Sequence, residues 1–177
     1  YAMVPANTTQ TVEDTDFVNI EGKEQYAISI HTGGYQNAKV IFRRCKITNS
    51  KRGGMTIRYA QPLIIEDNEF SNNENMYFNL RNLYGDLTFK NNKITNNKYG
   101  KIDVGRPNYH ASLEDYANRT YLFEGNSIVE SSDGSMEGFV VSLSDRSPDI
   151  SFLNNTIETR YDGIRVYGEK NASPKIT

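Results

Sequence analysis

The chain has 177 residues, a net charge of −2 and a pI of about 5.8, which argue against non-specific nucleic-acid binding as its main role. It is long enough for one domain with a core, it contains no apolar run of roughly 18 residues that could span a membrane, and it shows no signal peptide. Its single cysteine, Cys45, excludes an internal disulfide, and no Cys/His cluster offers a zinc site. Since the sequence begins with Tyr1 and stops at "SPKIT", we expect it to be a piece of a longer protein.

One short phrase recurs five times along the chain, as "VIFRRCKITNS", "LIIEDNEFSNN", "LTFKNNKITNN", "YLFEGNSIVES" and "ISFLNNTIETR". Aligned on one position, the phrases are separated by 23, 24, 34 and 29 residues, and that position holds Cys45, Asn68, Asn92, Asn126 and Asn155. A basic period of roughly 22 to 24 residues with insertions indicates a solenoid.

Each phrase is predicted to form a strand, a tight turn and a second strand. Apolar residues alternate before the turn, as in Leu87 and Phe89, and another apolar residue such as Ile94 follows it. We expect the aligned asparagines to adopt the left-handed backbone conformation of the turn and to hydrogen-bond from rung to rung. Cys45 takes the first position of this ladder as a small buried thiol.

A further alternating strand follows each turn, in "AISIHT", "MTIRY", "YFNLRN", "KIDVGR", "VVSLSD" and "GIRVYG". The sequence therefore predicts an all-β parallel solenoid of about six rungs with three strands each. Residues 1–16 would form an N-terminal cap or lead-in, residues 17–167 the rungs and residues 168–177 a C-terminal tail.

Charged residues beside the turn alternate in sign from rung to rung. Arg43, Glu66, Lys90 and Glu124 precede the turn, and Lys46, Glu69 and Lys93 follow it. Parallel rungs in register would place these side chains about 4.8 Å apart, where alternating charge is favourable. We interpret these columns as structural. An outward apolar stripe is also predicted, which the N-terminal segment or a partner domain would cover; it comprises Ile41, Ile64, Leu122 and Leu153.

The pattern resembles the right-handed parallel β-helix of the pectate-lyase-like superfamily over residues 17–167. The stretch "GGMTIRYAQPLIIEDNEFSNN" is most similar to rungs of chondroitinase B and alginate lyases, and to accessory β-helix domains of polysaccharide-degrading enzymes. The resemblance implies that a glycan lies along the strand that follows the variable loop, which we call the groove strand. It leaves function open, because this architecture hosts enzymes, phage spikes and binding modules.

The alternation of the groove strands predicts two outward columns. One holds Ser29, Thr56, Asn79, Asp103, Ser142 and Arg165, and the other holds His31, Arg58, Arg81, Gly105, Ser144 and Tyr167. The second column places three cationic or titratable side chains on consecutive rungs without alternation of charge. This arrangement fits a subsite for the carboxylate or sulfate of an acidic sugar. The alternative is a solvated column paired with acidic loop residues.

Catalysis by β-elimination is the alternative to this binding role. Arg58 and Arg81 could neutralise a uronate, and Asp103 with Asp145 could hold calcium. In the chondroitinase B and alginate lyase pattern, however, a lysine and an arginine are expected on neighbouring rungs. Lys101 begins a groove strand, but we predict that it points toward the edge. Hydrolysis is disfavoured, since no aspartate cluster and no carboxylate pair on adjacent groove rungs can be placed.

Tyrosines at the rung edges could stack on sugars, namely Tyr59, Tyr77, Tyr84, Tyr99, Tyr109 and Tyr167. The insertion between Gly105 and Thr120 would form a wall over the groove, carrying Tyr109, His110 and Tyr116. A second insertion, Ser131 to Gly138, is interpreted as a flexible loop.

We therefore expect a non-catalytic polysaccharide-binding module of an extracellular or cell-surface degradative protein, bacterial in type. It would contact other domains of its parent, bind no nucleic acid and have no membrane span. The predicted glycan site comprises His31, Arg58, Tyr59, Asn79, Arg81, Asp103, Tyr109, Arg165 and Tyr167. No cofactor is expected unless calcium binds. The first alternative is a lyase that acts on a uronic-acid glycan, and the second is a structural spike or adhesin domain.

Overall fold

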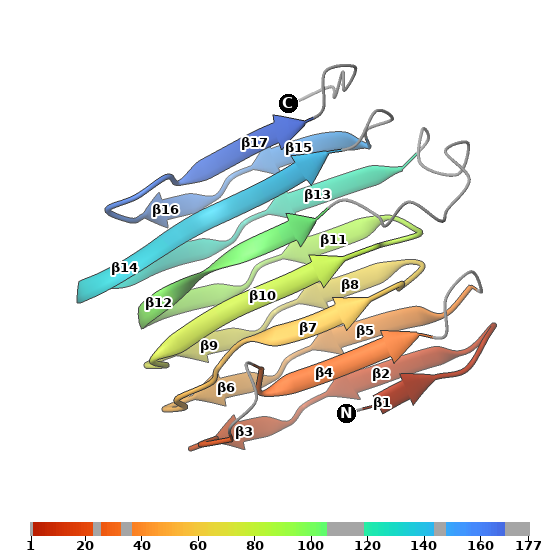
Figure 1. Cartoon of the computed structure of the whole chain (residues 1–177), viewed down its shortest axis with the longest axis horizontal. Helices are drawn as coiled ribbons and strands as arrows, with labels where there is room; N and C mark the ends of the chain where they lie inside the picture. Colours follow the sequence, from red (N-terminus) through yellow and green to blue (C-terminus); the bar gives the residue numbers. More distant parts are fainter. Residues whose placement is uncertain (1, 23–25, 33–36, 106–118, 144–147, 169–177) are drawn as a thin grey trace.

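The computed structural model describes residues 2–22, 26–32, 37–105, 119–143 and 148–168, and all of its regular elements are β-strands. The strands are stacked in parallel along one axis, with the N-terminus at one end of the stack and the C-terminus at the other (Figure 1). The predicted parallel solenoid is therefore confirmed, and it makes about five turns.

A six-stranded sheet forms one face, which we call the flat face. Its strands are β2 (Thr9–Glu13), β5 (Lys39–Arg43), β8 (Leu63–Glu66), β11 (Leu87–Lys90), β13 (Thr120–Glu124) and β15 (Asp149–Leu153).

The 11-stranded second sheet folds around a corner and supplies the other two faces. The middle face holds β3 (Asp16–Val18), β6 (Lys46–Thr48), β9 (Glu69–Ser71) and β16 (Thr156–Glu158). The groove face holds β1 (Ala2–Val4), β4 (Ile28–Thr32), β7 (Met55–Arg58), β10 (Asn75–Arg81) and β17 (Ile164–Gly168). Two long strands pass through both faces, β12 (Lys93–Gly105) and β14 (Ser127–Leu143).

The core is the interior of the stack, and aromatic side chains follow its axis. Phe42 lies between Phe17 and Phe70, with ring centroids 6.3 Å from each, and Phe123 packs 4.8 Å from Phe152. These rings come from the inward positions that the alternation predicted, and Phe42, Phe70 and Phe123 are fully buried. Burying each such side chain contributes on the order of 1.5–3 kcal/mol, so the regular alternation specifies both the rungs and much of their stability.

The predicted ladder forms at the corner between the flat and middle faces. Asn68 donates from Nδ2 to Asn92 Oδ1 at 2.9 Å, and Asn92 donates in the same way to Asn126 Oδ1 at 3.1 Å. Each Nδ2 also donates to a backbone carbonyl of the preceding rung, such as Ile65 O at 2.9 Å from Asn92. The ladder therefore satisfies polar groups that would otherwise be buried without partners.

The prediction that the ladder asparagines are left-handed is wrong by one position. Positive φ angles belong to the residue before each of them: Arg44, Asp67, Asn91, Gly125 and Asn154. This residue makes the bend and faces outward, which turns the next side chain inward for the ladder. A second asparagine ladder, which was not predicted, lies at the corner between the middle and groove faces. There Asn73 donates from Nδ2 to Asn97 Oδ1 at 3.0 Å.

The charge columns lie in register as predicted. Arg43 is opposite Glu66, which is opposite Lys90, and Lys90 pairs with Glu124 at 2.9 Å. On the other side of the turn, Glu69 lies between Lys46 and Lys93.

Three expectations from the sequence are corrected. The N-terminal segment does not cover the apolar stripe, because β2 joins the flat sheet beside β5 and β1 joins the groove face beside β4. Leu153 does not belong to the stripe. It lies opposite Glu124, at the end of the column that holds the charged residues, and Ser151 lies opposite Leu122 instead. The segment Ser131–Gly138 belongs to β14 and is not a loop.

The strand β14 also sits in a different register from the predicted one. Its pairing with β12 shifts at three irregularities, after which Phe139 lies opposite Ile102 and Val140 opposite Asp103. Ser142 therefore lies beside Tyr167 in the second outward column and not in the first. The sequence alternation alone could not place bulges inside a continuous strand.

Candidate functional site

The two outward columns of the groove face are in register over their first strands. His31 on β4 lies opposite Arg58 on β7, which lies opposite Arg81 on β10. Beside them, Ser29, Thr56, Asn79 and Asp103 occupy consecutive strands. The cationic column and the neighbouring polar row are therefore in register as predicted, and successive members of each lie about 4.8 Å apart along the axis of the stack.

Asp103 is the centre of a charged cluster in this face. Its Oδ2 accepts hydrogen bonds from the Tyr77 hydroxyl at 2.8 Å and from Arg81 Nη2 at 3.0 Å, and Lys101 Nζ lies 3.6 Å away. The carboxylate side chain is only 4% exposed, so these donors offset the cost of its burial. Burial and the bond to Asp103 raise the pKa of Tyr77, and the same carboxylate raises the pKa of Arg81.

The prediction that Lys101 points toward the edge is wrong. Lys101 lies opposite Tyr77 in the pairing of β10 with β12, and its Nζ is 5.6 Å from the centroid of the Tyr77 ring. A lysine and an arginine on neighbouring rungs consequently converge on one carboxylate.

Arg58 differs from Arg81 in having no carboxylate partner within the described ranges. It forms no ion pair with any described residue, and its Nε is buried without a hydrogen-bond partner among them. Burial lowers the pKa of the adjacent His31, and the Arg58 guanidinium lowers it further. Within the described residues, the column therefore holds a guanidinium without an acidic partner, next to an imidazole whose pKa is lowered.

The polar row beside Arg58 also has unsatisfied atoms. Thr56, Asn79 and Asp103 are 4%, 6% and 3% exposed, yet Thr56 Oγ1, Asn79 Oδ1 and Asp103 Oδ1 have no hydrogen-bond partner in the described part of the chain. Asn79 Nδ2 donates to the hydroxyl of Tyr26 at 2.9 Å, and the Tyr26 ring packs 6.0 Å from that of Tyr77. Tyr26 could not be predicted as part of this site, because it lies outside the repeated phrases and the periodic pattern of the strands.

The other predicted site residues are distributed more widely. Tyr59 stacks on the buried Tyr84 at 5.8 Å, and Tyr167 is 52% exposed at the far end of the column. Arg165 binds Asp162 and lies 3.6 Å from Glu137, with Val140 between it and Asp103. Tyr109, His110, Tyr116, Ser144 and Asp145 lie outside the described residues.

The calcium hypothesis finds little support in the geometry of Asp103. Three donors already occupy one of its oxygens, and two of them are cationic. Within the described ranges, no group of three or more acidic, histidine or cysteine side chains could hold a metal ion.

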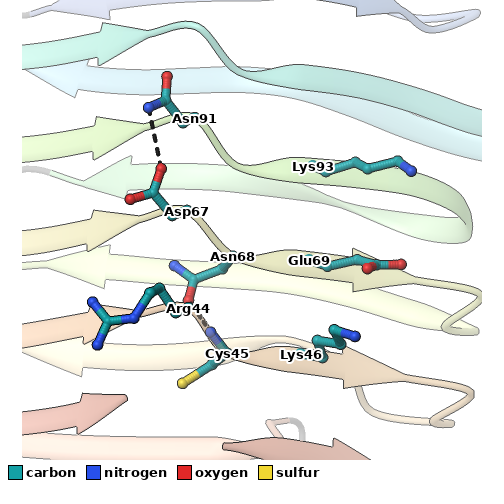
Figure 2. A pocket seen from close by; sticks show the side chains of 8 residues that line it. All are labelled: Arg44, Cys45, Lys46, Asp67, Asn68, Glu69, Asn91 and Lys93. Atoms are coloured by element: carbon teal, nitrogen blue, oxygen red, sulfur yellow. Dashed lines mark hydrogen bonds between the residues drawn. The ribbon is translucent and has the colours of Figure 1, made fainter. Parts of the chain in front are cut away.

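Two shallow hollows lie at the ladder corners, away from this face. The larger has a volume of about 430 Å³ and is bordered by Asp67, Glu69, Lys46 and Lys93, with Asn68 in its floor (Figure 2). Figure 2 shows Asn91 bonded to Asp67 and Asn68 bonded to the Cys45 backbone, so these polar groups already have partners within the protein. We therefore place the candidate site on the groove face, where unsatisfied polar atoms are concentrated.

Comparisons with known proteins identify the fold family. No curated protein and no solved structure gave a significant match to the chain. In the described part of the chain, no helix is long and apolar enough to cross a membrane. The family model described as "Right handed beta helix region" matches residues 2–157, which agrees with the stacked parallel strands, and the chain belongs to this right-handed β-helix family.

Proposed function

We propose that this protein is a non-catalytic polysaccharide-binding module of an extracellular or cell-surface carbohydrate-degrading protein, and that an acidic glycan lies along its groove face. The observation that carries the proposal is Arg58, a half-buried guanidinium that has no carboxylate partner among the described residues and lies in register between His31 and Arg81.

The contrast with the rest of the surface supports this role. At the ladder corner the same chain places Glu66 between Arg43 and Lys90 and pairs Lys90 with Glu124. On the groove face, Arg58 has no acidic partner among the described residues, and an anionic ligand would supply one. A guanidinium also presents a planar fork that matches a carboxylate.

Calorimetry with alginate, polygalacturonate and unsulfated chondroitin tests the proposal. We expect at least one polymer to bind with micromolar affinity, and Arg58→Ala to weaken that binding at least tenfold. Arg44→Ala is the charge-matched control, because Arg44 lies at the ladder corner and is paired with Asp14 at 2.7 Å. Absence of binding to the whole panel, or equal loss in both variants, would refute a glycan site at Arg58.

The convergence of Lys101 and Arg81 on Asp103 favours one alternative, a uronate lyase. In β-elimination a basic group removes the C5 proton, a cation neutralises the carboxylate, and an acid protonates the leaving oxygen. Lys101, Arg81 and Tyr77 lie together with the required types of side chain. Incubation of the same polymers with and without calcium, followed by the ultraviolet absorbance of unsaturated uronate, tests this alternative, and Lys101→Ala should abolish any signal.

A further inference from the structure

The polar row next to Arg58 bears on which acidic glycan can bind. Thr56, Asn79 and Asp103 are adjacent on β7, β10 and β12, and each has an oxygen that is shielded from solvent and has no hydrogen-bond partner among the residues that the structure describes. Buried oxygens without donors are rare in folded proteins and call for an explanation. Their alignment on three successive rungs indicates one extended feature and not three separate defects.

The chemical character of these oxygens restricts their partners. Asp103 Oδ1 belongs to a carboxylate, which only accepts hydrogen bonds, and Asn79 Oδ1 is likewise an acceptor. The donors that these atoms lack are of the kind that sugar hydroxyl groups supply. The Tyr26 hydroxyl already contacts Asn79 at 2.9 Å, so a phenol occupies one hydroxyl position of the row in this structure.

The position of the row relative to Arg58 restricts the ligand further. Thr56 and Arg58 are two residues apart on β7, and their side chains face the same side, roughly 6.6 Å apart along the strand. This separation is comparable to the width of a hexose ring. One sugar lying across the strand could therefore place its acidic group on Arg58 and its ring hydroxyls on the row.

We infer that the row of Thr56, Asn79 and Asp103 recognises free ring hydroxyls, so that the site selects unmodified uronate glycans over O-sulfated or O-acetylated ones. The inference rests on the proposed function. A sulfate ester replaces a donor with acceptor-only oxygens and brings negative charge toward Asp103, while an acetyl ester removes the donor alone. A site that is built to hydrogen-bond a hydroxyl strongly rejects an analogue that lacks it.

Three forms of one oligouronate test the inference: the unmodified oligomer, its O-acetylated derivative and its O-sulfated derivative, matched in length and measured by calorimetry at one ionic strength. The oligomer is galacturonate or mannuronate, according to which polymer binds in the panel above. We expect both derivatives to bind at least tenfold more weakly than the parent. If charge alone determined affinity, the sulfated form would bind more tightly than the unmodified oligomer, because it carries more negative charge.

Two isosteric variants connect the selectivity to the row. Thr56→Val should weaken binding of the unmodified oligomer severalfold, and Asp103→Asn should bring the affinity ratio of unmodified to sulfated oligomer toward one. Thermal unfolding of each variant checks that it is folded. Equal or tighter binding of either derivative, with Arg58→Ala still abolishing binding, overturns the inference and leaves the proposed function intact. Failure of the whole panel overturns both.

Discussion

Gly105 lies beside Arg81 in the neighbouring strand, and its lack of a side chain provides the space that Arg81 occupies on the way to Asp103. A Cβ on Gly105 would come within 2.7 Å of Arg81 Cγ and 3.0 Å of its Nε. The two residues therefore form one unit, in which glycine determines where the guanidinium points.

Replacing Gly105 with alanine should displace Arg81 from Asp103. Loss of one donor to a buried carboxylate costs about 1–3 kcal/mol of unfolding free energy, which urea denaturation would measure. In an Arg81→Ala background the same substitution should cost less than about 0.5 kcal/mol, because the side chain that clashes is gone. Additive costs in the double-mutant cycle would contradict the coupling.

Adjacent asparagines at the ladder corner should differ sharply in their importance. Asn92→Ala removes the acceptor of the Asn68 backbone amide and the donor to Ile65 O, leaving buried groups unsatisfied, and should cost about 3–5 kcal/mol. Asn91→Ala, one residue away, should cost only about 1–2 kcal/mol, since it places alanine at a φ of 52° on an exposed turn. Equal costs in urea denaturation would refute the division of roles between these positions.

Binding of an acidic glycan should depend on pH through His31. Burial and Arg58 hold the pKa of His31 below its usual value, so the imidazole is neutral at pH 7. A bound anion offsets the repulsion by Arg58 and raises this pKa, which couples binding to proton uptake. Affinity should therefore increase as the pH falls from 7 toward 5, by roughly tenfold for a shift of one unit. Calorimetry at several pH values would detect the slope, and His31→Gln should remove it.

The folded state should lose stability in alkaline solution because of Tyr121. Burial raises the pKa of this phenol to about 12, whereas in the unfolded chain it ionises near 10. The stabilising contribution is complete below pH 10 and is lost as the pH rises through 12, amounting to up to roughly 3 kcal/mol. Tyr121→Phe should flatten the decline in urea midpoint over this range. Tyr161→Phe is the control, because Tyr161 is 59% exposed, and a flattening in both variants would contradict the assignment.

The regular parts of the molecule could be predicted from sequence because the same constraint acts on every rung. Inward alternation leaves one register that buries Phe42, Phe70 and Phe89, and that register brings His31, Arg58 and Arg81 together. The outward direction of Lys101 could also have been predicted, because Lys101 and Asp103 are two residues apart on one strand and therefore face the same side.

The remaining parts of the site depend on features that periodicity does not encode. Bulges inside β14 shift its register, and the turn-type residues between Ser131 and Gly138 indicate a loop there and not a bulged strand. The contact between Tyr26 and Asn79 joins residues 53 positions apart, one of which lies outside any strand. That Arg58 has no acidic partner in the described part of the chain depends on where neighbouring side chains reach, which the order of residues along the chain does not specify.

The corner between the flat and middle faces has one further property. At every rung it is crossed by two residues, from Asp14 and Thr15 through Asn91 and Asn92 to Asn154 and Asn155. The connections from the groove face back to the flat face vary instead, from residues 59–62 to residues 106–119. The largest length change thus lies at an edge of the groove face, so loops there can be lengthened, exchanged or grafted while the opposite corner keeps every rung in register. The fold therefore has one corner of constant length and one connection of variable length, and the candidate site lies next to the variable connection.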